Sequence, residues 1–202
     1  MDRETIVAAA LALLDEVGLD GLTTRRLAAE LDVKSPALYW HFRNKQELVD
    51  EMARAIQAEQ DIGAPPRTGE SWRDWLARRA RERREVLLAH REGARLVAGT
   101  SPGPEIAVAF DRELAVLVKA GFTPVGAMRA ITTLGAYVTG FVLEEQGRSA
   151  RPPSQGPPAD AATRTPTLMA AVAQGGVPDG PAAFDDGLAL LLDGIAASQR
   201  AS

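Results

Sequence analysis

The chain has 202 residues with a formal net charge of −4, and 46% of them are hydrophobic, which suffices for one or two domains with a sizeable core. It contains no cysteine, so disulfides, thiol nucleophiles and cysteine metal sites are excluded. No uninterrupted apolar run is long enough to span a bilayer, and Met1-Asp2-Arg3-Glu4 lacks the basic start and apolar middle of a signal peptide, so we expect a cytoplasmic protein without a membrane partner.

A first helix is predicted from apolar residues that recur at three- and four-residue spacing near the N-terminus. The sequence GLDGL at 18–22 follows this stripe, and glycine in such a position typically ends a helix. The stripe consists of Ile6, Val7, Ala10, Leu13, Leu14 and Val17.

Two short helices separated by a tight turn are predicted next. Thr23 is expected to cap the first helix, and Ser35 is expected to cap the second, which starts at Pro36. Only residues 32–34 remain between them. Helices joined by so short a turn form a helix-turn-helix, whose second helix can enter a DNA major groove.

Helices this short cannot bury a core alone, so flanking helices must support them. Residues Asn44 to Glu47 have the pattern of a capping box and predict the start of a longer helix. Together with the first helix it would cover the apolar side of the motif. The residues that need this cover are Leu27, Leu31, Val33, Leu38 and Phe42.

The segments GLTTRRLAAELDV at 21–33 and PALYWHFRNKQEL at 36–48 resemble the signature of TetR-family transcriptional regulators, and GESW at 69–72 is similar to the tetracycline-repressor branch. The resemblance implies an all-α protein with an N-terminal three-helix DNA-binding domain at 1–60. A C-terminal helical domain at 61–202 would bind a ligand and dimerise. The implied partners are double-stranded DNA with an inverted-repeat operator, a small-molecule effector and a second copy of the chain.

Positive charge gathers around the motif although the whole chain is acidic. The basic residues there are Arg25, Arg26, Lys34, Arg43 and Lys45. The acidic residues of the supporting helices are Asp15, Glu16, Asp20, Asp50 and Glu51. A weakly charged body with one basic face favours binding of a specific DNA site over indiscriminate binding.

The start of each motif helix supplies candidate base contacts. Arg25 can form two hydrogen bonds with a guanine or grip a phosphate, and the family uses this position to read bases. Ser35, Pro36 and Ala37 have short side chains that let the backbone approach base edges and thymine methyls.

Tyr39, Trp40 and His41 are consecutive, so they cannot all face one core and some of them should face DNA. In similar proteins these residues, with Thr24 and Lys45, hold phosphate or sugar. The alternative is that Tyr39 or Trp40 packs between helices.

Helix breakers at 60–68 predict a joint, and a long helix ending near His90 follows. Arg79 and Arg83 fall within its apolar stripe, and Glu113 on a later helix is a candidate partner. An Arg–Glu network could brace the core, or the arginines could meet a carboxylate, phenolate or phosphate of an effector. In a third interpretation, arginine stems pack inward while their heads reach water.

The tetracycline-repressor resemblance aligns the drug-contacting positions with Asp61, Arg79, Arg83, Val97, Thr100, Glu113 and Glu144. Only Thr100 and Glu144 match the residue types of that branch. Asp61 and Val97 stand where it has histidines, the second of them a metal ligand, and Arg79 and Arg83 replace an amide and an aromatic. We therefore predict an effector other than magnesium–tetracycline.

The C-terminal part is predicted to be helical and to dimerise. Thr123-Pro124 opens a helix with apolar residues on more than one side, which implies packing within one larger core or against a partner subunit. Segment 147–164 has the proline, glycine and serine content of a mobile linker. The apolar face of a final helix at about 182–198 fits half of a four-helix dimer interface.

Enzymatic functions are not indicated. His41 and His90 are the only histidines, too few for a metal cluster and poorly placed for a Ser-His-Asp arrangement, and no glycine-rich phosphate loop is evident. We predict no cofactor and no catalytic residue. The function predicted is a homodimeric repressor that an effector releases from its operator; the alternative is a small-molecule-binding or protein-interaction module without operator binding.

Overall fold

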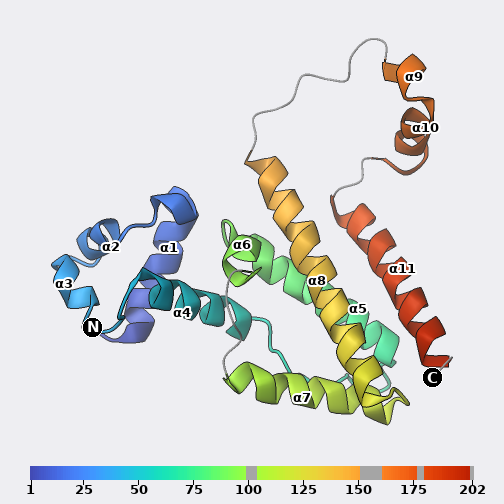
Figure 1. Cartoon of the computed structure of the whole chain (residues 1–202), viewed down its shortest axis with the longest axis horizontal. Helices are drawn as coiled ribbons and strands as arrows, with labels where there is room; N and C mark the ends of the chain where they lie inside the picture. Colours follow the sequence, from blue (N-terminus) through green and yellow to red (C-terminus); the bar gives the residue numbers. More distant parts are fainter. Residues whose placement is uncertain (99–103, 151–160, 177–179, 201–202) are drawn as a thin grey trace.

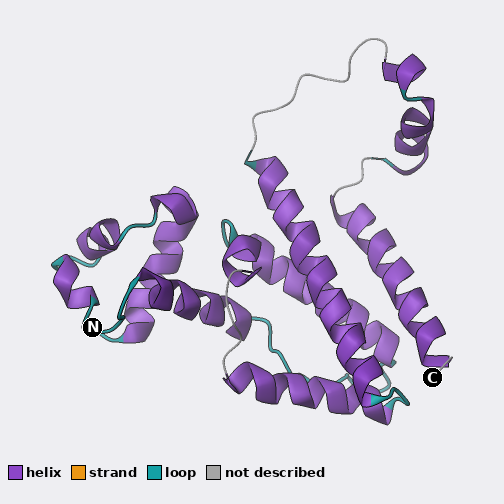
Figure 2. Cartoon of the chain, in the orientation of Figure 1, coloured by secondary structure: helices purple, strands orange, loops and turns teal. Residues whose placement is uncertain are grey.

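The protein is described by a computed structural model that covers residues 1–98, 104–150, 161–176 and 180–200. Within these ranges every regular element is a helix and no strand occurs (Figure 2). The predicted all-α class is confirmed.

Four helices form the N-terminal part, on the left in Figure 1. Asp2 caps the first by accepting a hydrogen bond from the Thr5 N–H at 2.8 Å, and Gly18, with a φ of 72°, breaks its helical geometry near the end. Glycine tolerates this backbone conformation without a Cβ clash. The helices are α1 (Arg3–Gly21), α2 (Thr24–Glu30), α3 (Ser35–Leu38) and α4 (Lys45–Ala58).

Capping side chains place these helices nearly as the sequence predicts. The Thr23 hydroxyl accepts from the Arg26 N–H at 3.2 Å, and the Asn44 side chain accepts from the Glu47 N–H at 2.9 Å. The prediction that Ser35 caps α3 is wrong, because Lys34 occupies the cap and makes no side-chain capping bond. Pro36 alone therefore favours the start of this helix, as its fixed φ suits the first turn.

The C-terminal part lies on the right of Figure 1, where α11 (Gly180–Arg200) runs alongside α8 (Pro124–Ser149) and α5 (Trp72–Ala89) crosses α8. α8 packs against α5, α6, α7 and α11, so it is the central element. Among the described helices, only α8 is long and apolar enough to cross a membrane, with a mean hydropathy of 1.2 over an 18-residue window. Core helices of soluble proteins have the same length and composition. The main helices are α5 (Trp72–Ala89), α6 (Gly93–Ala98), α7 (Pro104–Lys119), α8 (Pro124–Ser149) and α11 (Gly180–Arg200).

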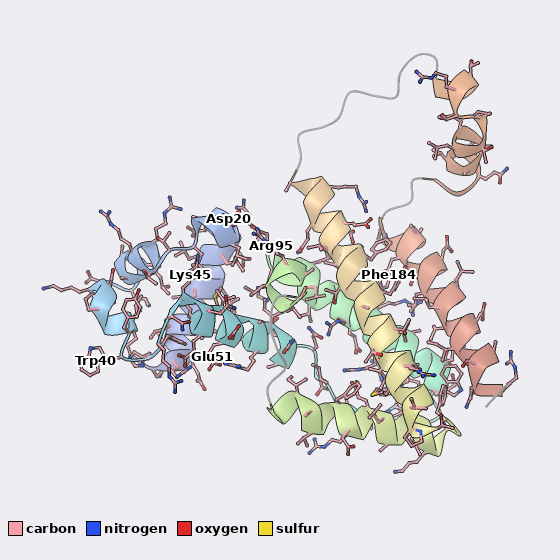
Figure 3. All side chains as sticks on the ribbon, in the orientation of Figure 1. Asp20, Trp40, Lys45, Glu51, Arg95 and Phe184 are labelled. Atoms are coloured by element: carbon pink, nitrogen blue, oxygen red, sulfur yellow. The ribbon has the colours of Figure 1, made fainter. Side chains whose placement is uncertain are left out.

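Aromatic rings fasten α11 to α8. Phe184 of α11 is buried against α8 (Figure 3). The centre of its ring lies 5.4 Å from that of Tyr137 and 5.3 Å from that of Phe141. Its backbone carbonyl accepts a hydrogen bond from the Tyr137 hydroxyl at 2.8 Å. The Phe184 ring lies under the Arg84 guanidinium, which pairs with Glu145 at 2.6 Å. Aromatic burial and a charged pair therefore set the position of α11.

Segment 147–164 is helical at both of its ends. α8 continues through Ser149, and α9 (Ala161–Arg164) and α10 (Pro166–Gly175) follow. The middle of the segment, 151–160, lies outside the described residues, as does 99–103 before α7. The predicted mobility is therefore not tested.

Candidate DNA-binding surface and effector cavity

The turn between α2 and α3 is fixed by backbone hydrogen bonds. The Val33 N–H donates to the Ala28 carbonyl at 2.9 Å, and the Asp32 N–H donates to the Ala29 carbonyl at 3.2 Å. Asp32 has a φ of 51°, a left-handed conformation that aspartate tolerates better than most residues. This turn reverses the chain within a few residues and thus sets the direction of α3.

Burial of two apolar residues forces their neighbours outward. Leu38 and Phe42 are buried, whereas Tyr39 is 54% exposed and Trp40 is 88% exposed. Figure 3 shows Trp40 projecting from the N-terminal part. The alternative that Trp40 packs between helices is therefore wrong, and His41 is partly buried beside it.

The other predicted DNA contacts lie on the same end of the molecule. Arg25, Pro36 and Lys45 are exposed, and Thr24, Ser35 and Ala37 are partly exposed. Arg26 instead donates to the Gly21 carbonyl at 3.2 Å, so it also holds the end of α1. The whole predicted set belongs to α2, α3, the turn after α3 and the start of α4, and none of its members is buried; we refer to these residues as the candidate DNA-binding surface.

Arg3 contacts residues that follow α3 and residues of α4, a role that was not predicted from the sequence. Its guanidinium lies 4.6 Å from the centre of the Phe42 ring and pairs with Glu47 at 3.0 Å and Glu51 at 2.8 Å. The carboxylate of Glu47 also accepts from the Arg43 N–H at 2.7 Å. These contacts connect α1, the end of the helix-turn-helix and α4.

A cavity of about 220 Å³ lies in the C-terminal part. It is bounded by the end of α4 and by α5, α7 and α8. Apolar side chains make up most of its wall, as in many small-molecule sites. They include Trp75, Leu76, Ile106, Phe110, Leu134 and Val138.

Arg79 forms an internal network at one side of the cavity. It donates to Glu113 at 2.6 Å and to the carbonyls of Gln60 at 2.9 Å and Asp61 at 2.8 Å. Glu113 is buried and also accepts from the Gly63 N–H at 3.0 Å. The bracing interpretation therefore holds for Arg79, which ties the joint after α4 to α5 and α7.

Arg83 has different surroundings. Its guanidinium donates to the Gln60 side-chain oxygen at 2.7 Å and to the Thr139 hydroxyl at 3.2 Å, but its buried Nε has no partner among the described residues. Burial lowers the pKa of Arg83, against the opposing effect of the Glu113 charge. Arg83 therefore does not join the Arg79–Glu113 pair directly.

Asp61, Val97 and Glu144, which were also predicted to contact the effector, do not line this cavity. Asp61 is exposed and contributes only its backbone carbonyl, with a φ of 45°. Val97 is buried in α6, and Glu144 is exposed on α8, 3.5 Å from Arg148. Thr100 lies outside the described residues. Within a single subunit, the cavity thus brings together Arg79, Arg83 and Glu113 of the predicted set.

Gln60 is a cavity residue that the sequence analysis missed. It is only 4% exposed, lines the cavity, and has an unpartnered Nε2 atom. The signal was present, since Met52, Ile56 and Gln60 continue one buried stripe at four-residue spacing along and past α4.

A supported helix-turn-helix with exposed aromatic side chains, joined to a helical part with a mostly apolar cavity, defines a transcription regulator of the one-component class. Residues 6–52 match the model of bacterial regulatory proteins of the tetR family, and residues 65–199 match that of the tetracyclin repressor-like C-terminal domain. The chain therefore belongs to the TetR family of transcriptional regulators, in its tetracycline-repressor-like branch.

Relatives support this assignment over nearly the whole chain. The class A tetracycline repressor protein from transposon 1721 of Escherichia coli is 44% identical over 97% of this chain and 91% of its own. A crystal structure of a possible TetR-family regulator from Streptomyces coelicolor has a TM-score of 0.84 and 40% identity, covering 98% of this chain and 100% of its own. ActR of Streptomyces coelicolor in complex with (S)-DNPA has a TM-score of 0.81 and 29% identity, covering 98% of each chain.

Proposed function

We propose that the protein is a cytoplasmic homodimeric repressor whose two helix-turn-helix units bind an inverted-repeat operator, and that a small molecule in the cavity releases it. The observation that carries the operator proposal is the outward presentation of Tyr39 and Trp40 beside exposed Arg25 and Lys45. Large aromatic side chains are rarely left exposed on a surface that has no partner. In this proposal Arg25 and residues 35–37 contact bases.

The remaining residues of the surface hold the phosphate backbone in the same proposal. Thr24, Tyr39, Trp40, His41 and Lys45 would contact phosphate or sugar and so fix the register of α3 in the major groove. Operator binding is tested by fluorescence anisotropy with a labelled duplex from the region upstream of the gene. We expect binding that weakens steeply with salt and exceeds binding to a shuffled duplex. Equal affinity for both duplexes would overturn the proposal.

Dimerisation is proposed from the apolar surface that α8 and α11 leave open. Val125, Met128 and Leu143 are exposed on α8, and Leu190 is 74% exposed on α11. Such a two-helix face suits a four-helix interface with a second copy, placing two recognition helices on one side of the dimer. Light scattering after size exclusion should show a dimer for the wild type and a monomer for Leu190→Glu. Val108→Glu, at an exposed residue of α7, is the matched control and should stay dimeric.

Magnesium–tetracycline is not the effector in this proposal, although a relative, the class A repressor, has been crystallised with 5a,6-anhydrotetracycline and magnesium. Val97 offers no ligand atom for a metal, and the Asp61 side chain faces solvent. A tetracycline titration with magnesium should leave the operator complex intact. Release at micromolar tetracycline would overturn this part of the proposal.

The signal would travel through the joint after α4. Arg79 holds the carbonyls of Gln60 and Asp61, so a ligand that displaces its guanidinium changes the support of the α4 end. Because α4 packs on α1, a small shift there would reorient the helix-turn-helix. DNA affinity would fall by the coupling free energy between the two sites.

A further inference from the structure

Two positively charged side chains, Arg79 and Arg83, and one negatively charged side chain, Glu113, line the cavity between α5, α7 and α8. Arg79 is matched by Glu113, whereas the contacts described above for Arg83 are with the neutral oxygens of Gln60 and Thr139. Glu82 lies 3.9 Å from Arg79 on the outer side, where it pairs with Arg78 at 2.9 Å. The other described residues of the cavity wall are uncharged.

Two buried donors at this cavity have no acceptor within the part of the chain that the structure describes. They are Nε of Arg83 and Nε2 of Gln60. The orientation of the Gln60 amide follows from chemistry, because the Arg83 guanidinium can only donate and must face the amide oxygen. The unpartnered atom of Gln60 is therefore the nitrogen of its NH₂ group, so both unpartnered atoms are donors that an acceptor would satisfy.

Burial makes this arrangement costly without a ligand. A guanidinium removed from water is stabilised by an anion far better than by neutral oxygens, and an unfilled buried donor loses its hydrogen bond to water. The lowered pKa of Arg83, which burial causes, agrees with an environment that disfavours its charge. A ligand acceptor with a negative charge would satisfy both needs at once.

The rest of the wall restricts what such a ligand can be. Trp75, Phe110 and Leu134 also line the cavity, and its volume of about 220 Å³ has room for a ring-sized apolar body. A strongly hydrated dianion such as a phosphate ester would bring more charge than the single excess cation can balance. An apolar molecule with one acidic group matches both parts of the wall.

We infer that the effector is a small organic monoanion, a carboxylate or an ionised phenol on an apolar ring system, whose acidic group binds beside the side chains of Arg83 and Gln60. This inference rests on the proposed role of the cavity as the effector site. It assigns Arg83 and Gln60 to ligand selection and leaves Arg79 and Glu113 as the internal brace.

The test compares two probes of one shape, 2-naphthoate and 2-naphthamide, by isothermal titration calorimetry on the full chain without DNA. A charged acceptor facing a guanidinium should make naphthoate bind at least about tenfold more tightly than the amide. Equal affinities, or no binding of naphthoate at millimolar concentration, would overturn the inference.

Three variants separate charge recognition from a general loss of structure. In Gln60→Glu the new carboxylate should pair with the Arg83 guanidinium and balance its charge. This variant should therefore lose the preference for naphthoate and still bind naphthamide. Arg83→Met should remove the same preference, and the control Arg81→Met, at an exposed residue of the same helix, should keep it. A preference that survives both cavity variants would overturn the inference. Operator binding, measured separately on unliganded protein, tests the proposed repressor function independently of these results.

Discussion

The carboxylate of Glu92 accepts a hydrogen bond from the Leu19 N–H at 3.0 Å and thereby joins the turn before α6 to the end of α1. Arg95 of α6 pairs with the neighbouring Glu92 at 2.7 Å. It also pairs with Asp20 of α1 at 3.1 Å, across the same boundary (Figure 3). A Cβ atom on Gly18 would lie 2.7 Å from the Glu92 carboxylate, so the close approach needs glycine there. Together with the Arg91 N–H, which donates to the Asp15 carboxylate at 2.7 Å, this contact links the cavity-bearing part to the helix that supports the DNA-binding surface.

Replacing Glu92 should loosen this link without affecting the core. In Glu92→Ala the Leu19 N–H loses its acceptor, and we expect the free energy of unfolding to fall by about 1 kcal/mol. The Leu19 amide should exchange its hydrogen faster than in the wild type, as measured by hydrogen–deuterium exchange. Glu85→Ala, an exposed residue of α5, is the control and should leave Leu19 protected. Unchanged exchange in Glu92→Ala would show that the link does not restrain α1.

Trp40→Ala and Lys45→Ala should weaken DNA binding in different ways. Trp40 is 88% exposed, so its removal should change the free energy of unfolding by less than about 0.5 kcal/mol. It carries no charge, so the salt dependence of DNA binding should keep its slope while the affinity falls. Lys45→Ala should reduce that slope by about 1, because one phosphate contact is lost. Anisotropy titrations at several salt concentrations distinguish the two, and full DNA affinity in Trp40→Ala would remove this residue from the interface.

Local patterns made the helix-turn-helix predictable from sequence. The caps at Thr23 and Asn44 and the apolar spacing of α1 act within one or two turns, and the structure reproduces them. The error at Ser35 has a physical cause, since proline can begin a helix without a capping side chain. α6 was not predicted, because six residues hold too short a pattern to identify a helix.

Long-range partners were harder to predict. The position of Arg79 in an apolar stripe indicated a buried anion, and Glu113 was identified because it lies on a similar stripe. The partner of Arg83 could not be found this way, because Gln60 lies past the end of α4, 23 residues away, and pairs through a neutral oxygen. A rule that seeks opposite charges does not detect a neutral partner.

Low pH should weaken the contact between Glu70 and Arg78. Two hydrogen bonds from Arg78, at 2.8 and 2.9 Å, and one from the Arg67 N–H lower the pKa of Glu70 from 4.5 to about 2. Because the folded pKa is below the unfolded one, the carboxylate stabilises the fold above about pH 4.5, and this contribution is lost as the pH falls towards 2.

The prediction is checked by urea unfolding of the wild type and Glu70→Gln across this pH range. The wild type should be the more stable at neutral pH, and the two should converge as the pH approaches 2. In an Arg78→Met background the pH-dependent difference should shrink, because the first cause of the shift is gone. A difference that stays constant with pH would contradict the assigned interaction.

Removing only one partner of the buried Arg79–Glu113 pair should lower the free energy of unfolding substantially. Glu113→Ala leaves the Arg79 guanidinium buried without its anion, and we expect a loss of about 3–5 kcal/mol in the free energy of unfolding. The double variant Arg79→Met, Glu113→Leu removes both charges, so it should lose clearly less than the sum of the single changes. The exposed pair of Arg81 and Asp185 is the control, and Arg81→Ala should cost less than about 1 kcal/mol. If Glu113→Ala proved as mild as Arg81→Ala, Arg79 would have another anion or water within reach, and its hold on the joint after α4 would not depend on Glu113.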